Sequence, residues 1–288
     1  MTLRLGSNEF DDDELIVMAV VNRTPDSFYD KGSAYQLHDA IAQVDNAVAS
    51  GAQIIDIGGV KAAPGPNISP AEEIRRVNSV VPVVRERHPT VVISVDTWRA
   101  EVAEAAIVAG ADMINDAWGG YDSDVACVAA GYDSGLVCTH AGGLTPRTVF
   151  RDTDYPDVMA DVRATLTALA EKAVSVGVSR DSILIDPGHD FRKTTAHSLE
   201  VTRRLGELTS GPWPVLVAVS NKDFIGETLD LPVTQREEGT LATLTVCAQL
   251  GARVFRVHNV AQARRALDVV SAMRGERWSG QRVPRHSW

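Results

Sequence analysis

Short apolar runs recur along the chain, and each stops on a polar or charged residue before a helix-like stretch begins. The runs are rich in Val and Ile with little polar alternation, which is typical of parallel strands that are buried on both faces. Eight runs alternating with helical crossovers predict an α/β fold, a closed (β/α)8 TIM barrel that forms a single domain over residues 15–274. The runs end at or near Asn22, Asp56, Asp96, Asn115, His140, Asp186, Lys222, and Arg256 with His258.

Stretches with helical periodicity connect these apolar runs. Several of the helical stretches end on a glycine, such as Gly51 or Gly110, which favours helix termination. An additional stretch, near residues 124–131, has the weakest pattern. In such a barrel the polar residues that end the strands meet at one mouth, and we expect the active site there. The clearly periodic stretches are residues 37–51, 69–87, 98–110, 155–177, 194–208, 234–251 and 261–273.

Length and charge narrow the possible function classes. A chain of 288 residues accommodates one barrel with short tails. Its formal net charge of −10 argues against nucleic-acid binding, which needs an excess of Lys and Arg. Cys127, Cys138 and Cys247 form no CxxC pair, so we expect buried thiols in a reducing compartment. We expect a polar segment at residues 1–14, a flexible basic tail at residues 275–288, no membrane contact and a cytoplasmic location.

Amide and carboxylate side chains end several of the strands. At a strand end, Asn22 can coordinate a hard cation or donate to a phosphate oxygen, although it can also cap the following turn. Asp96 and Asn115 end successive strands, and Asp186 ends a strand on the opposite side. An ionised carboxylate accepts two parallel N–H bonds, so this group matches the donor-rich edge of a 2-amino-4-oxo heterocycle.

Three basic groups lie near the ends of the last two strands. Lys222 follows the seventh run, and Arg256 and His258 stand two apart on the eighth, so both point to one face. Barrels of this type often hold a phosphate at that place. The Arg-x-His pair can therefore be an anion clamp or, alternatively, part of a buried ion pair, and we predict the clamp.

Six ordered motifs resemble those of the dihydropteroate synthase family, and the resemblance extends over residues 15–273. The motifs are NRTPDSFYDKG, GAQIIDIGG, ISVDTWRAEVAEAAIVAGADMINDAWGG, DPGHDFRKT, SNKDFIGET and FRVHNV. Such enzymes are transferases that displace diphosphate from a hydroxymethyl dihydropterin diphosphate with the amine of 4-aminobenzoate, assisted by Mg²⁺. The resemblance also implies a homodimer. It implies that the pterin is held by Asp96, Asn115, Asp186 and Lys222. It further implies that the diphosphate is met by Asn22, Arg256 and His258, with Asn22 at the metal ion, and that Lys222 joins these three in catalysis.

The chain departs from the family pattern on the side of the second substrate. After Gly59 the family reads Glu-Ser-Thr-Arg-Pro-Gly, whereas this chain reads Val-Lys-Ala-Ala-Pro-Gly. Ser-Arg-Lys-Ser becomes Ser-Asn-Lys-Asp, which places the Asp223 carboxylate where an anionic benzoate should lie. DPGIGFGKT becomes DPGHDFRKT, and we expect the new residues, His189, Asp190 and Arg192, to lie at the surface. The residues carried over to the aminobenzoate side are Pro64, Phe191, Ser220 and Asp223.

We therefore predict a dihydropteroate-synthase-like protein that keeps the pterin and diphosphate site but has weak or absent synthase activity. Loss of one preorganised donor or cation at a reacting centre typically costs about 10²–10³ in rate. An active synthase is the first alternative, provided that Lys61, Asn221 and Asp223 find another geometry. A non-catalytic pterin or anion binder, in which the barrel is a scaffold, is the second.

Overall fold

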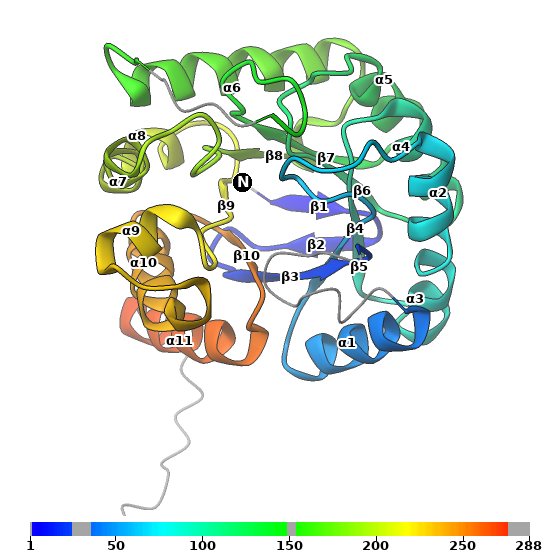
Figure 1. Ribbon diagram of the computed structural model, residues 1–288, viewed down its shortest axis with the longest axis horizontal. Coiled ribbons are helices and arrows are strands. Elements are labelled where there is room, and N and C mark those ends of the chain that lie inside the picture. The colour runs from blue at the N-terminus through cyan, green and yellow to red at the C-terminus, as the bar shows by residue number, and fades with distance from the viewer. Residues whose placement is uncertain (1, 25–35, 149–153, 276–288) are drawn as a thin grey trace, which may run out of the picture.

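An eight-stranded parallel sheet forms the centre of the protein, in a computed structural model that describes residues 2–24, 36–148 and 154–275. The strand order is β8-β7-β6-β5-β4-β3-β10-β9. A parallel bridge between Ile185 and Val215 links β8 to the segment that leads into β9, so the sheet curls round on itself (Figure 1). The predicted eight-stranded barrel in one domain is confirmed. The strands are β3 (Ile16–Asn22), β4 (Ile54–Gly58), β5 (Val92–Asp96), β6 (Met113–Asp116), β7 (Gly135–Thr139), β8 (Ile183–Asp186), β9 (Leu216–Val217) and β10 (Val254–Val257).

Neighbouring residues on each strand alternate between two apolar cores. On β3, Ile16 and Met18 face the inner core, while Val17 and Val21 pack outward beneath the helices. Burial on both faces explains why the strand sequences show little polar alternation. The other strands fill the inner core with Ile54, Val92, Met113, Val137, Leu184, Leu216 and Val254.

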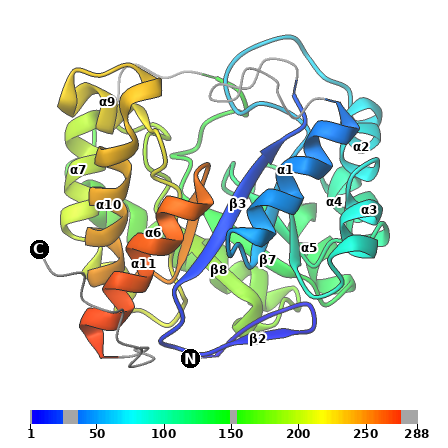
Figure 2. The same cartoon turned by 90° about the horizontal axis from the view of Figure 1, so that it is seen from below.

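An antiparallel hairpin of β1 (Leu3–Leu5) and β2 (Asn8–Phe10) covers the amino end of the barrel, beside the start of β3 (Figure 2). Leu5 approaches Gly135 so closely that a Cβ on this glycine would lie 2.7 Å from the leucine side chain. Residues 1–14, which we expected to be a polar segment, thus include a hairpin that the sequence analysis did not predict, because strands of three residues are too short for periodicity to reveal. The apolar hairpin side chains that join the inner core are Leu3, Leu5 and Phe10.

Helices surround the barrel, and every stretch predicted as helical contains one. Residues 124–131, which had the weakest pattern, coincide with α5. The helices are α1 (Leu37–Ala49), α2 (Pro70–Asn78), α3 (Val81–Arg87), α4 (Ala100–Val108), α5 (Asp124–Gly131), α6 (Val158–Ser175), α7 (Thr195–Arg203), α8 (Gly206–Thr209), α9 (Asp223–Leu229), α10 (Glu237–Gln249) and α11 (Val260–Arg274).

Two predicted helices are interrupted, and one helix was not predicted. Residues 69–87 divide into α2 and α3 because Pro82, in the first turn of α3, has no N–H with which to continue an earlier helix. Residues 194–208 divide into α7 and α8, where Gly206 begins the second helix. The unpredicted helix, α9, follows Lys222 directly.

No helix in the described ranges is long and apolar enough to cross a membrane. The last described helix, α11, ends at Arg274, and Gly275 follows it with a φ of 80°, which suits a glycine cap. Beyond this glycine, the predicted basic tail lies outside the described residues.

Candidate functional site

A row of four residues, three of them predicted site residues, crosses four neighbouring strands at their carboxyl ends. The strand register sets Asn22, Gly58, Asp96 and Asn115 side by side on β3 to β6. A Cβ at Gly58 would lie 3.3 Å from the Asn22 Oδ1 atom, so this amide oxygen lies close over the glycine. A side chain at position 58 would therefore press on the Asn22 amide.

The remaining predicted residues occupy the same end of the barrel on the other strands. Asp186 is the last residue of β8, and Arg256 lies in β10. Lys222 follows β9 and His258 follows β10 directly. The predicted pterin and diphosphate groups are therefore all located at the carboxyl mouth.

Arg256 is paired with two carboxylates. Its Nε atom lies 2.6 Å from Asp56 Oδ2, and its Nη2 atom lies 3.0 Å from Asp96 Oδ2. Asp56 also accepts hydrogen bonds from Ser94 Oγ at 2.6 Å and from Asn115 Nδ2 at 3.2 Å. In this structure Arg256 thus forms the buried ion pair that was the alternative to an anion clamp.

Asp56 is a site residue to which the sequence analysis gave no role. Its side chain is 0% exposed, and it connects Arg256 to the row of residues on β4 to β6. A signal was present, because Asp56 is the only charged residue in the apolar run IIDIGG. An ionised group in a strand that is buried on both faces needs a charged or hydrogen-bonding partner.

Asp96 holds its proton more tightly than an ordinary aspartate. Burial, with a smaller contribution from the neighbouring carboxylate of Asp56, raises the pKa of Asp96 to about 7 against the opposing effect of Arg256. Asp96 therefore takes up a proton at a higher pH than an exposed aspartate does. A ligand that donates two N–H bonds to this carboxylate favours its ionised form.

Asp186 and Lys222 lie on the other side of the mouth. Asp186 Oδ1 accepts a hydrogen bond of 2.7 Å from the Gly188 amide, and burial raises the pKa of Asp186 although Lys222 opposes the shift. Lys222 Nζ donates to the His189 carbonyl oxygen at 3.1 Å and lies 4.8 Å from the centroid of the Phe191 ring. Lys222 thus contacts the retained aromatic ring, and its charge acts on the buried carboxylate of Asp186.

His258 is neutral at physiological pH. Burial lowers the pKa of His258 to about 3, and the positive charges of Arg256 and Lys222 act in the same direction. The Nδ1 atom of His258 lies 3.0 Å from Ser220 Oγ, which is itself buried. In this state His258 offers a neutral hydrogen-bonding group rather than a positive charge.

An apolar wall that the sequence analysis did not predict lines the mouth. Trp98 and Trp118 are buried with ring centroids 6.2 Å apart, and Phe191 lies 5.2 Å from Trp118 in an edge-on arrangement. Val60 and Leu144 belong to the same cluster. Each tryptophan follows a polar strand end by two or three residues, a spacing that could have revealed the wall.

The loop after β4, residues 59–68, is attached to the segment that follows β7. Arg147 Nη1 donates to the Pro66 carbonyl at 2.6 Å, and its Nε donates to the Ala63 carbonyl at 3.2 Å. Val60, at the start of the loop, is buried in the apolar wall. The loop that lacks the family's Thr and Arg is therefore held by contacts at both ends.

Two residues assigned to the aminobenzoate side, Pro64 and Asp223, lie at the surface, and Asp223 has a charged partner within the chain. Pro64 is exposed in the loop after β4. The side chain of Asp223 is 67% exposed and lies 2.8 Å from Arg236 Nη1. Arg236 compensates this charge, which weakens the repulsion of benzoate that we expected from Asp223.

His189 is not a surface residue, so that expectation is wrong. Its side chain is buried, its Nε2 atom lies 3.0 Å from Thr202 Oγ1, and its ring stacks on Phe224 with a centroid separation of 5.5 Å. The loop after β8 folds inward between α7 and α9, which places His189 beneath the mouth. Burial lowers the pKa of His189 to about 3, so its ring is neutral.

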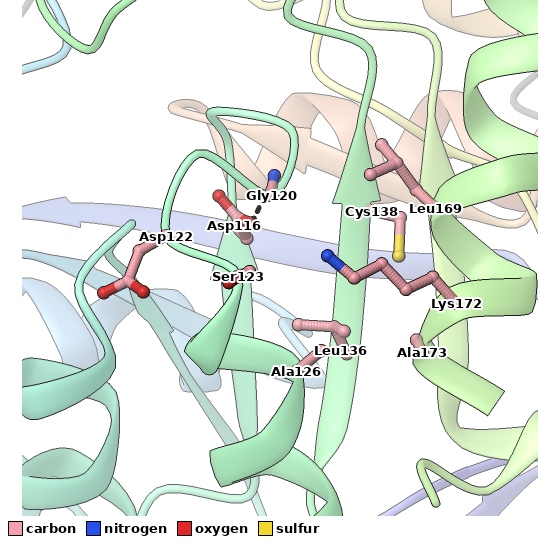
Figure 3. Close-up of a pocket in the computed structure, with 10 residues that line it drawn as sticks. All are labelled: Asp116, Gly120, Asp122, Ser123, Ala126, Leu136, Cys138, Leu169, Lys172 and Ala173. Carbon is pink, nitrogen blue, oxygen red and sulfur yellow. Dashed lines mark hydrogen bonds between the residues drawn. The ribbon is translucent and has the colours of Figure 1, made fainter. Parts of the chain in front are cut away.

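A separate small pocket lies on the flank of the barrel, between α5 and α6 (Figure 3). Lys172 reaches it from α6 and Asp122 from the loop that precedes α5, and Cys138 and Asp116 border it from the strands. The Asp116 carboxylate accepts hydrogen bonds from the amides of Trp118 and Gly120. Residues predicted for the mouth do not line this pocket, which is therefore not the expected substrate site.

A family model of pterin-binding enzymes matches residues 18–258. The chain belongs to the pterin-binding enzyme family. Two mycobacterial relatives are both named inactive dihydropteroate synthase 2. The one from Mycobacterium leprae is 49% identical over 269 residues, which cover 92% of each chain. The one from Mycobacterium tuberculosis H37Rv is 50% identical over 269 residues, which cover 92% of this chain and 85% of the relative.

Dihydropteroate synthases are also similar to the chain in sequence and in structure. The enzyme from Bacillus subtilis is 38% identical over 265 residues, which cover 91% of this chain and 89% of the relative. A crystal structure of the Yersinia pestis enzyme with a sulfonamide drug complex has a TM-score of 0.90 at 32% identity, covering 96% of this chain and 100% of that one. The Xanthomonas albilineans enzyme in complex with 7,8-dihydropteroate has a TM-score of 0.83 at 32% identity, covering 95% and 99%.

Proposed function

We propose that this chain binds a pterin at the barrel mouth but has weak or no dihydropteroate synthase activity. The proposal rests on a difference between two sides of the barrel mouth. The pterin-side and diphosphate-side groups are gathered near Arg256, whereas the loop after β4 and the start of α9 carry other residue types with partners of their own. The names of the two mycobacterial relatives support the same reading.

The pterin would be held by carboxylates, an amide and a lysine that the mouth already presents. Asp96 and Asp186 can accept the N–H groups of the 2-amino-4-oxo ring, and Asn115 can both donate and accept. Lys222 can donate to a ring acceptor, because its ammonium group has three protons. The wall around Trp118 excludes water from one side of this region.

The diphosphate would be met by Asn22, Arg256 and His258, together with Mg²⁺. In the described residues, no three His, Cys, Asp or Glu side chains are arranged to hold a metal ion. Mg²⁺ often takes few protein ligands and several oxygens from substrate phosphates and water, so a single amide oxygen from Asn22 fits that pattern. When bound, the ion would neutralise charge on the departing diphosphate.

In the synthase reaction the bond from the exocyclic CH₂ carbon to the diphosphate oxygen breaks, and the arylamine nitrogen forms a new C–N bond to that carbon. Arg256 would stabilise the charge on the leaving group through its guanidinium. Ala62 and Ala63 stand where the family has a Thr hydroxyl and an Arg guanidinium. Two lost donors of this kind would each remove about 10²–10³ in rate, which is the reason for weak or absent turnover.

An active synthase remains the second candidate function. Pro64, Phe191 and Lys222 are retained from the family pattern, and a relative of 38% identity is named dihydropteroate synthase. The two candidates predict different turnover for the same purified protein.

A steady-state assay with the dihydropterin diphosphate and 4-aminobenzoate, with and without Mg²⁺, tests the proposal. Calorimetric titration with 6-hydroxymethylpterin accompanies it. We expect pterin binding with turnover near the detection limit. Turnover at about 1 s⁻¹ or faster, as in ordinary metabolic enzymes, would establish the active synthase instead. Failure to bind the pterin would contradict the proposed pterin site.

We further propose a cytoplasmic homodimer. Apolar side chains are exposed on two adjacent helices, namely Val246 on α10 and Val269 and Met273 on α11. A two-fold axis could bring such faces together. Sedimentation of the wild type and of Val269→Asp would test the dimer, because a charge in a shared apolar interface should shift the protein towards the monomer.

A further inference from the structure

We propose that Asp190 determines specificity on the second-substrate side of the mouth. The Asp190 carboxylate accepts hydrogen bonds from the backbone N–H groups that follow Lys222. Because these donors are already occupied, Asp190 excludes an arylamine that carries a carboxylate. The inference rests on the proposed function, because it concerns the aminobenzoate side of that site.

Both oxygens of the Asp190 carboxylate are engaged. The Asp223 amide donates to Oδ2 at 2.6 Å, and the Phe224 amide also donates to this carboxylate. Ser198 Oγ, on α7, lies 3.2 Å from Oδ1. Asp190 therefore connects the loop after β8 with α7 and α9, and it uses the main-chain donors of Asp223, which the family resemblance assigns to the aminobenzoate side, and of Phe224.

The backbone of Asp190 holds the carboxylate in this place. The residue has a φ of 66°, in the left-handed region, and the family pattern has glycine at this position. Aspartate tolerates that region better than most residues with a side chain. The Asp190 amide also donates to Ser198 Oγ at 3.2 Å, so both the main chain and the side chain of Asp190 are tied to α7.

The charged groups around Asp190 already have partners within the chain. Lys222 Nζ is bonded to the His189 carbonyl and lies over Phe191. Arg236 is paired with Asp223 and also donates to the Asn221 carbonyl at 3.0 Å. A benzoate would have to displace Asp190 from its donors and leave a partly buried carboxylate without them, which is costly. A neutral arylamine avoids this competition.

Paired ligands can test the proposal. The full-length protein would be titrated with 4-aminobenzoate and with its uncharged analogue 4-aminobenzamide, both alone and with saturating 6-hydroxymethylpterin, diphosphate and Mg²⁺. Asp190→Gly removes the carboxylate and suits the left-handed backbone. Asp190→Asn is the matched control, because it keeps the shape and an acceptor oxygen but removes the charge.

We expect Asp190→Gly to raise the affinity for 4-aminobenzoate relative to 4-aminobenzamide by roughly tenfold or more, because the freed N–H groups can donate to the ligand's carboxylate. The gain in Asp190→Asn should be several-fold smaller. An unchanged ratio in Asp190→Gly overturns the proposal. An equal gain in both variants also overturns it, since charge repulsion and not occupation of the donors would then be the cause.

A replacement variant and the titration without pterin keep the possible outcomes distinguishable. If Asp190→Gly does not fold, as judged by circular dichroism, Asp190→Ser takes its place with the same expected ratio. If the wild type binds no pterin, the proposed function fails. The ratio measured without pterin still decides the role of Asp190.

Discussion

Replacing Arg256 with methionine is expected to destabilise the protein strongly. The substitution keeps much of the side-chain volume but removes the only charged partner of Asp56 among the described residues. Asp56 is fully buried, and it would retain only the neutral donors Ser94 and Asn115. Removing one partner of a buried ion pair typically costs about 3–5 kcal/mol, because the other charge stays buried and uncompensated. We therefore expect a decrease of this size in the free energy of unfolding.

Urea unfolding, followed by fluorescence and circular dichroism, measures this change. Asp56→Asn in the Arg256→Met background should restore most of the stability, since no buried charge is then left unpaired. Arg75→Met is the matched control, because Arg75 pairs with Glu72 on the surface and such pairs contribute about 0–1 kcal/mol. A loss below about 1 kcal/mol in Arg256→Met, or no recovery in the double variant, would refute the reasoning.

Three further predictions concern the mouth and the amino end. Because the pKa of Asp96 is raised to about 7 and only the ionised carboxylate accepts two N–H bonds, pterin affinity should fall as pH decreases below about 7. A binding profile that stays flat between about pH 5.5 and 8.5, a range that brackets this pKa, would contradict the prediction. Arg147→Ala should speed hydrogen exchange and proteolysis in the loop of residues 61–67, because the hydrogen bonds from Arg147 to two carbonyl groups of this loop are lost. Unaltered rates would show that other contacts hold the loop. Leu5→Ala should lower the free energy of unfolding by about 2–5 kcal/mol through a cavity beside Gly135, and thermal denaturation showing wild-type stability would rule out a structural role for the hairpin.

The barrel could be predicted because its pattern is repeated and local. Val and Ile runs buried on both faces, separated by helical stretches, specify parallel strands without knowledge of any particular contact. The hairpin and α9 could not be predicted in this way. Each buries few residues, and their position depends on distant partners such as Gly135 and Arg236.

The location of the candidate site could also be predicted, but the ion pairs within the site could not. Strand ends meet at one mouth whatever their residues are, so the position of Asp96 and Arg256 followed from topology. The partners of Arg256 depend on strand register and side-chain reach. Its Cα pairs with that of Met18 on β3, yet its guanidinium reaches Asp56 on β4 and Asp96 on β5.

The charges at the mouth explain why the pterin, the diphosphate and Mg²⁺ should bind as a coupled set. Among the described residues, Arg256 lies between Asp56 and Asp96, and Lys222 and Lys193 act on Asp186, whereas the low pKa of His258 keeps its ring neutral, so the cations do not outnumber the carboxylates. At an effective dielectric near 20, two like charges about 4 Å apart repel by about 4 kcal/mol, so an unaccompanied diphosphate gains little here. A bound divalent cation would add two positive charges at the mouth and so make the binding of the diphosphate favourable. If Arg256 then turns from Asp96 to a phosphate oxygen, the Asp96 carboxylate becomes available to the pterin N–H groups, and each ligand prepares the site for the other.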